Sequence, residues 1–245
     1  MRRWRRWVLV TVFAIVFSLS CALLAQWQFS RLEGRRRANA LIQTNYQAAT
    51  APLTSVLAPG KPWSPALTWR AVTVKGTYDT SRQVLLRRRV LNGADGFWVL
   101  TGMTTPTGLV WAVRGWIPAG PDARTSPSIP ASPTGEVTIS GHLTGPERST
   151  TVQGLPAGQQ QTAGPTELTA LARGARAFPA LVLVDKENPA ADPSPRRIPA
   201  PSLDDGPHLS YAIQWIVFAF AGWIGWWVIV TRMREDDTPV TEGSH

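Results

Sequence analysis

The residues best suited to bind a ligand or a metal lie at the start of an apolar run near the C-terminus. The stretch PHLSYAIQW carries His208, Tyr211, Gln214 and Trp215 in two helical turns. If this run is a helix, His208 lies at its N-terminus, where the positive end of the helix dipole disfavours an imidazolium and keeps the ring neutral. A neutral imidazole can ligate a metal ion. The residues alone therefore leave two interpretations open, an interfacial belt of aromatic side chains and a histidine able to ligate iron.

Two apolar runs without charge must position these residues, one over residues 7–29 and one over residues 211–231. As a helix, the first run spans roughly 34 Å, enough to cross a hydrocarbon core of about 30 Å. The basic start MRRWRR also allows a cleaved signal peptide. No clear cleavage site follows it, however, so we expect two retained transmembrane helices, at residues 7–29 and 208–231.

Flanking basic residues predict how the two helices are oriented. The first helix has arginines at both ends, but Arg232 and Arg234 follow the second, and SLDDG precedes it. By the positive-inside rule, residues 1–6 and 232–245 are cytoplasmic and residues 30–207 form an extracytoplasmic domain. Arginine far outnumbers lysine, and no Ser-rich transit region precedes the first helix. We therefore expect a multi-pass protein of a bacterial plasma membrane.

The segment between the helices alternates apolar and polar residues, a pattern typical of β-strands. We expect the first helix to continue to about Ala51, and a short helix at residues 166–173. Val72, Val74 and Tyr78 are predicted to share a core face, and the arginines at 87–89 to lie on a solvated edge strand or to face an acidic partner. The prediction is an antiparallel β barrel or sandwich with strands at residues 69–79, 82–90, 96–105, 108–117, 136–145 and 180–186.

The composition of this 245-residue chain argues against several functions. The one cysteine, Cys21, lies in the first apolar run, so the domain has no thiolate or disulfide. We find no nucleophile elbow, phosphate loop or zinc-protease motif, and we predict neither enzymatic activity nor catalytic residues. His142 reads as a strand surface residue. Because much of the basic charge behind the net charge of +9 brackets the membrane, anionic lipids are the expected partner, and no nucleic acid is expected.

The outer ends of the two helices concentrate polar and aromatic side chains. Trp27, Gln28 and Arg31 of the first helix fall at the same predicted depth as His208 and its neighbours. A spacing typical of one helix face relates His208, Tyr211, Trp215, Phe218 and Gly222. Haem carries an iron for a histidine and two carboxylates for which Arg31 or Arg35 is suited. The cluster therefore makes a haem site possible, with no metal expected beyond the iron at His208.

Four segments also resemble a known family in their order along the chain. They are AQWQFSRLEGRRRANALI, WRAVTVKGTYD, the pair GFWVLTGM and WAVRGWIPAG, and HLSYAIQWIVFA. Together they resemble the Surfeit locus protein 1 family of cytochrome c oxidase assembly factors. Relatives often carry asparagines where this chain has DDGPH.

This resemblance implies a β domain between two helices and a role in maturing a haem–copper oxidase, in which some bacterial relatives are thought to hold haem a. It assigns the haem-linked histidine to His208, followed by Tyr211 and Trp215. Trp27, Gln28 and Arg31 match the first-helix motif, and Gly76, Arg114, Gly115 and Trp116 match the β-domain motifs. The expected function is transient holding of haem a for oxidase subunits or a respiratory supercomplex. The alternative is an accessory subunit that stays bound to the oxidase through the Trp-rich second helix.

Overall fold

The computed structural model describes residues 2–120, 125–150 and 152–235, and the chain divides into two compact units. The helical unit joins Met1–Asn39 to Leu203–His245, and the β unit covers Ala40–Ser202. Helix α1 extends over Arg2–Gln47 and helix α4 over His208–Glu235. Both expected helices are confirmed, including the extension of the first towards Ala51.

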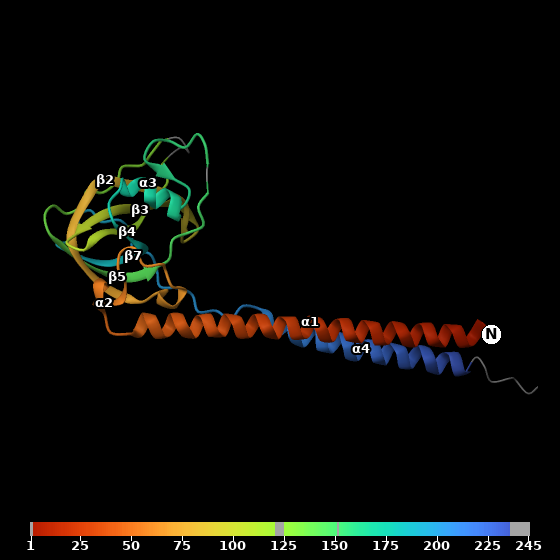
Figure 1. Cartoon of the computed structure of the whole chain (residues 1–245). Coiled ribbons are helices and arrows are strands. Elements are labelled where there is room, and N and C mark those ends of the chain that lie inside the picture. The colour runs from red at the N-terminus through yellow and green to blue at the C-terminus, as the bar shows by residue number, and fades with distance from the viewer. Residues whose placement is uncertain (1, 121–124, 151, 236–245) are drawn as a thin grey trace, which may run out of the picture. The chain divides into compact units, whose positions relative to one another are not determined.

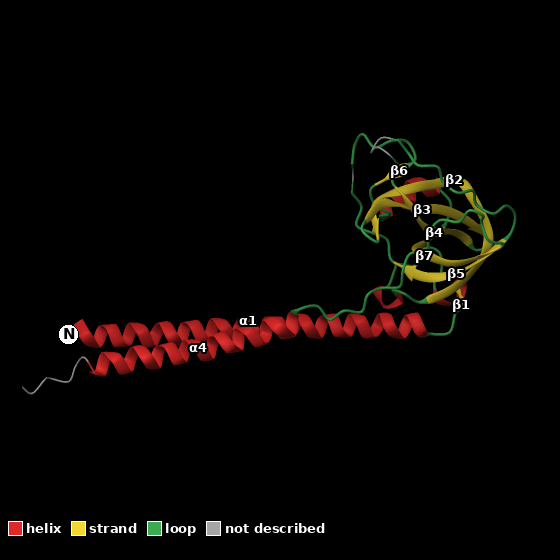
Figure 2. Ribbon diagram, turned by 180° about the vertical axis from the view of Figure 1, so that it is seen from behind, coloured by secondary structure: helices red, strands yellow, loops and turns green. Residues whose placement is uncertain are grey.

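Both helices are long and apolar enough to cross a membrane, by length and composition. They lie side by side in the helical unit (Figures 1 and 2). Residues 236–245 of the expected cytoplasmic tail lie outside the described residues.

The described residues of the β unit form seven strands and three short helices. In chain order these are β1 (Ala51–Pro52), α2 (Leu53–Val56), the 3₁₀ helix η1 (Pro65–Leu67), β2 (Ala71–Leu91), β3 (Ala94–Thr105), β4 (Gly108–Pro118), β5 (Val137–Thr144), β6 (Gln159–Gln160), α3 (Pro165–Ala172) and β7 (Ala177–Asn188). Helix α3 confirms the short helix expected at residues 166–173.

The strands form one mixed sheet, in place of the expected antiparallel barrel or sandwich. The order is β1-β2-β3-β4-β7-β5, and the long strand β2 also pairs with β5 and β6 (Figure 2). The pairs β2–β3, β3–β4, β5–β7 and β2–β5 are antiparallel, whereas β1 and β6 run parallel to β2, and β7 runs parallel to β4. Alternation of apolar residues reveals a strand but not the direction of its partner, which explains the difference.

The two strands expected at residues 69–79 and 82–90 are one strand, β2. The polar residues 79–82, which read as a turn, form a register shift against β3. The Asp79 carboxylate accepts hydrogen bonds from the backbone N–H and the hydroxyl of Ser81 and pairs with Arg82. These local contacts satisfy the polar groups of the irregular segment, so the strand continues through it.

Two apolar clusters fill the sheet interior, and one of them confirms the predicted core face. Val72, Val74 and Tyr78 belong to one of them. The other contains Leu109, Trp111 and Val113 with Leu168 and Ala172 of α3. Helix α3 thus covers this part of the sheet with its apolar side.

The run Arg87–Arg89 is not a solvated edge. Immediately before it, β2 pairs with β3 on one side and with β6 on the other. Arg87 bonds to Gln159 of β6, and Arg89 pairs with Glu147 at 2.7 Å and lies over the Trp98 ring. Arg88, in the register shift between them, is exposed with a φ of 56°. The bulge thus separates an outward guanidinium from two that bind within the unit.

Candidate functional site

A seam of small and apolar residues joins the two long helices. The buried residues of α1 are Ala14, Cys21, Ala25, Gln28 and Leu32, spaced by three, four or seven positions. Ala212 of α4 is fully buried, and Gly222 sits so close to α1 that an added Cβ would lie 2.8 Å from Cδ1 of Phe17. Small residues at such spacing allow two helix backbones to approach closely in lipid. Gln28 is the polar exception on this seam.

His208 and Gln28 meet at the end of the seam. His208 is the first residue of α4, and its Nδ1 lies 2.9 Å from Oε1 of Gln28, whose side chain is buried. An amide oxygen only accepts hydrogen bonds, so Nδ1 is the donor, and in the imidazole tautomer that this requires the lone pair lies on Nε2. Outer hydrogen bonds of this kind orient the histidine ligands of metals. The structure thus places two of the predicted residues in direct contact.

Gly206 leaves room beside the free edge of that ring. Its φ is +72°, and a Cβ added there would lie 3.7 Å from Nε2 of His208. A glycine accepts this left-handed backbone without strain. The ring nitrogen able to bind a ligand therefore has backbone, and no side chain, as its near neighbour on this side.

The segment before α4 is held on α1 by its two aspartates. Asp204 accepts a hydrogen bond of 2.8 Å from the backbone N–H of Gly206. Asp205 pairs with Arg36 at 2.9 Å and accepts a hydrogen bond from Asn39 at 3.3 Å. This contact was not predicted from the sequence, although acidic residues before one helix and arginines near the end of the other are a pattern typical of such an ion pair. The aspartates of DDGPH thus anchor the start of α4.

The other predicted residues surround this contact without hydrogen bonding to it among the described residues. Trp215 is half-buried and meets Phe218 edge to face, with ring centroids 5.7 Å apart. Tyr211 is 47% exposed, Trp27 is 55% exposed, and Arg31 is exposed. These side chains are therefore available at the surface of the helical unit. Within the described part of the chain, no group of three or more His, Cys, Asp or Glu could hold a metal ion.

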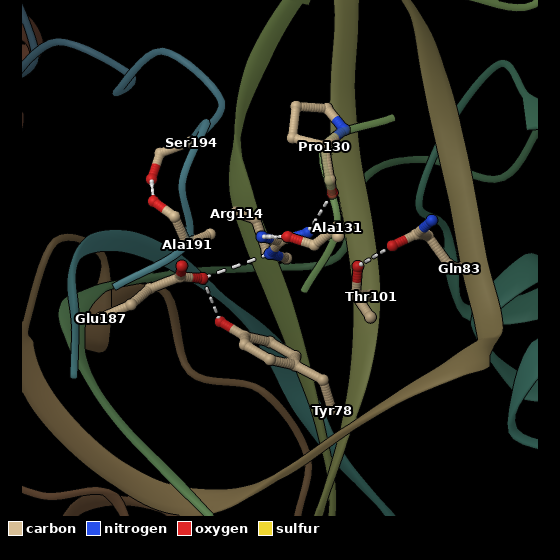
Figure 3. A network of polar contacts seen from close by, with 9 residues as sticks. All are labelled: Tyr78, Gln83, Thr101, Arg114, Pro130, Ala131, Glu187, Ala191 and Ser194. Atoms are coloured by element: carbon tan, nitrogen blue, oxygen red, sulfur yellow. Dashed lines mark hydrogen bonds and ion pairs between the residues drawn. The ribbon is translucent and has the colours of Figure 1, made fainter. Parts of the chain in front are cut away.

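The β-domain motif residues have architectural contacts. The Arg114 side chain is fully buried and donates to Oε1 of Glu187 at 3.2 Å and to the carbonyls of Pro130 and Ala131 at 3.0 and 2.9 Å (Figure 3). Tyr78 donates to the same carboxylate oxygen at 2.6 Å. Burial, and then the charge of Glu187, raise the pKa of the Tyr78 phenol. This network fastens the Pro- and Ser-rich loop that contains Pro130 and Ala131 to the sheet.

The next two motif residues, Gly115 and Trp116, also have structural contacts. A Cβ on Gly115, whose φ is +146°, would lie 2.5 Å from the carbonyl oxygen of Arg196. The Trp116 indole donates to the carbonyl of Arg89 at 2.7 Å. Close backbone approach and a satisfied buried indole therefore account for these residues without a chemical role.

His142 is buried, which corrects its interpretation as a strand surface residue. Its ring stacks on Tyr46 with centroids 4.2 Å apart, and Nδ1 lies 2.7 Å from Oδ2 of Asp185. Trp69 closes the cluster at 5.9 Å from the imidazole. Tyr46 belongs to the last turn of α1, so an aromatic stack fastens this turn to β5 within the β unit.

Comparisons with known proteins agree with these motifs. The model of the SURF1 family matches residues 15–220. Uncharacterized SURF1-like proteins of Mycobacterium bovis and of two strains of Mycobacterium tuberculosis are each 30% identical to the chain over 225 residues. The alignment covers 89% of this chain and 81% of each relative. The chain therefore belongs to the SURF1 family, whose members are generally assembly factors of cytochrome oxidase.

Proposed function

We propose that this protein assists the assembly of a haem–copper cytochrome c oxidase by transiently holding haem a where α1 and α4 meet. The observation that carries the proposal is the contact between His208 and Gln28. A ring held by a buried amide at Nδ1 is oriented so that Nε2 could hold the haem iron. Family membership supplies the oxidase as the destination.

The surroundings of His208 suit a haem in charge and shape. The exposed Arg31, which forms no ion pair among the described residues, carries a guanidinium suited to the propionate groups. Tyr211 and Trp215 supply aromatic surface for the macrocycle on α4, and Trp27 supplies it on α1. When bound, the haem would supply the iron, the macrocycle and the propionates, and the chain would supply the ligand, the countercharge and the aromatic wall.

We place the protein in a bacterial plasma membrane, with both termini cytoplasmic and residues 30–207 outside. The basic residues Arg232 and Arg234 in the last turn of α4 support this orientation by the positive-inside rule. Arg234 also lies over the ring of Trp7, with its Cζ 5.0 Å from the centroid, so basic groups from both helices gather at this end. The His208 end would then face the outer leaflet, beside the space where the oxidase is assembled.

The visible spectrum of the purified full-length protein tests the proposal. We expect a haem a spectrum from cells that make haem a, its loss in His208→Ala, and a shifted spectrum in Gln28→Ala because the imidazole loses its orienting acceptor. His142→Ala is the matched control, since that histidine is buried in the β unit, and it should keep the spectrum. A wild-type protein without haem, or a His208→Ala variant with an unchanged spectrum, would refute haem holding.

A stably bound accessory subunit is the second candidate, and the surface of α4 favours it. Phe220, Ile224 and Trp227 are 61–67% exposed, which leaves a large apolar and aromatic face for another membrane helix. Affinity purification of the assembled oxidase distinguishes the two functions. One copy per mature complex supports the accessory subunit, whereas presence only in immature complexes supports the assembly factor.

A further inference from the structure

An apolar groove lies between α1 and α4 in the part of the helical unit away from His208. Its volume is about 340 Å³. The lining residues used below are Phe13 and Phe17 of α1 and Phe218, Gly222, Gly225 and Trp226 of α4. Phe13 and Phe17 stack at 6.2 Å and form one wall, and Trp226 is held by a hydrogen bond of 3.0 Å to Thr11.

Two glycines of α4 have different relations to this groove. A side chain at Gly222 would strike Phe17, so this glycine sets the approach of the two helices. A Cβ at Gly225 would meet nothing within 4 Å. Helix packing therefore explains the glycine at position 222 but not the one at position 225. Gly225 leaves the groove open where alanine or leucine would fill it.

The groove lies on the same side of the helices as the proposed haem residues. An α-helix repeats its azimuth after about five turns, or about 18 residues. By this repeat, Arg31 lies above Phe13 on α1, and Tyr211 lies above Ile229, another groove residue, on α4. Trp215 and Phe218, in edge-to-face contact, lie between the two ends. An aromatic path thus leads from His208 to the groove along one face.

The separation along this face is that of a prenyl chain. Phe218 follows His208 by about 15 Å of helix and Gly222 by about 21 Å, at the rise of 1.5 Å per residue. A farnesyl chain extended from the rim of a macrocycle at His208 has about the length of ten helical residues, roughly 15 Å, so it enters the groove at Phe218 and ends before Gly225, which lies about 26 Å along the helix. A leucine at position 225 would lean back toward the N-terminus of α4 and so fill the part of the groove next to the end of the chain. Its branched, unsaturated and uncharged units suit a pocket lined by phenylalanine and glycine.

We infer that this groove is the subsite for the hydroxyethylfarnesyl tail of the haem. The inference rests on the proposed function, because the tail is anchored by the ring at His208. It assigns the discrimination between prenylated and plain haem to Gly225 and its neighbours. His208 and Arg31 recognise features that all haems share, so a second site is required for that discrimination.

The affinities of full-length protein in nanodiscs for haem o and haem b test this inference. Haem o carries the farnesyl tail where haem b has a vinyl group. The ratio of the two affinities therefore measures the contribution of the tail to binding. We expect wild type to bind haem o about tenfold more tightly, and Gly225→Leu, which fills the groove, to bring the ratio near one. Ile216→Phe adds bulk at an exposed position nine residues before Gly225, which places it on the opposite side of α4, and it should keep the wild-type ratio. Circular dichroism verifies that each variant retains its helices.

The outcomes separate the groove from the proposed function. If wild type binds neither haem, both ideas fail. If it binds both haems through His208 with equal affinity, or if Gly225→Leu keeps the preference for haem o, haem holding stands and the tail subsite is refuted. Equal affinity would leave the groove to the acyl chains of the surrounding lipid.

Discussion

Removing Glu187 should destabilise the β unit by about 3–5 kcal/mol, because it leaves a buried guanidinium without its countercharge. The Arg114 side chain is 0% exposed and that of Glu187 is 9% exposed. In Glu187→Ala, the two bonds from Arg114 to the carbonyls of Pro130 and Ala131 remain, but the positive charge has no partner in a dry environment. Because small domains are stable by only about 5–15 kcal/mol, such a loss should be plainly measurable.

A double-mutant cycle distinguishes the charge from the packing. Replacing both residues by methionine leaves no unpaired charge, so we expect the double variant to be less destabilised than the sum of Arg114→Met and Glu187→Met. Urea unfolding of the full-length protein in detergent, followed by tryptophan fluorescence, measures each free energy. A cost below about 1 kcal/mol for Glu187→Ala would be that of a surface ion pair and would refute the reasoning. So would strict additivity in the cycle.

Four further outcomes follow from the β unit and α1. Burial and the nearby Glu187 raise the pKa of Tyr78, so the protonated phenol stabilises the fold fully below the unfolded-state pKa of about 10. This stability is lost as the pH rises further, and Tyr78→Phe should reduce the decrease in unfolding free energy with pH in this alkaline range. Hydrogen bonding by Ser81 lowers the pKa of Asp79, so Asp79→Asn should remove a stability loss that wild type shows as pH falls below about 4. Gly115→Ala should cost at least about 2 kcal/mol in urea unfolding, since its Cβ would overlap a backbone oxygen at a positive φ, whereas Gly34→Ala should raise the helix stability of α1 by up to about 1 kcal/mol, since its Cβ meets nothing.

Periodicity and composition were sufficient to locate most elements. Charge-free apolar runs predicted α1 and α4, and alternation predicted β3, β4, β5 and β7 close to their observed bounds. The single strand β2 was split in the prediction, because Asp79 and Ser81 are typical turn residues when read without their hydrogen bonds. A local polar pattern looks the same whether it reverses a chain or forms a bulge within a strand.

The candidate site was predicted in part. The positions of Gln28 and His208 at matching depths followed from counting residues along two helices, but the pairing of their side chains depends on how the helices rotate about their axes. The anchor between Arg36 and Asp205 depends on the same rotation. Tyr211 and Trp27, chosen by residue type, lie at the surface instead.

The sequence alone determines which functional groups this protein has and how they are spaced along a helix, because neither depends on residues distant in the chain. Two apolar runs long enough to cross a membrane, a histidine at the start of one of them, a β unit without cysteine and the family motifs all belong to this class. Packing, in contrast, determined that β7 runs parallel to β4, that Arg114 is buried against Glu187, and that Gly225 opens onto a groove. Each of these features depends on which surfaces pack together. A given apolar strand or helix face could pack against several others of similar hydrophobicity, and only the complete fold selects one of them.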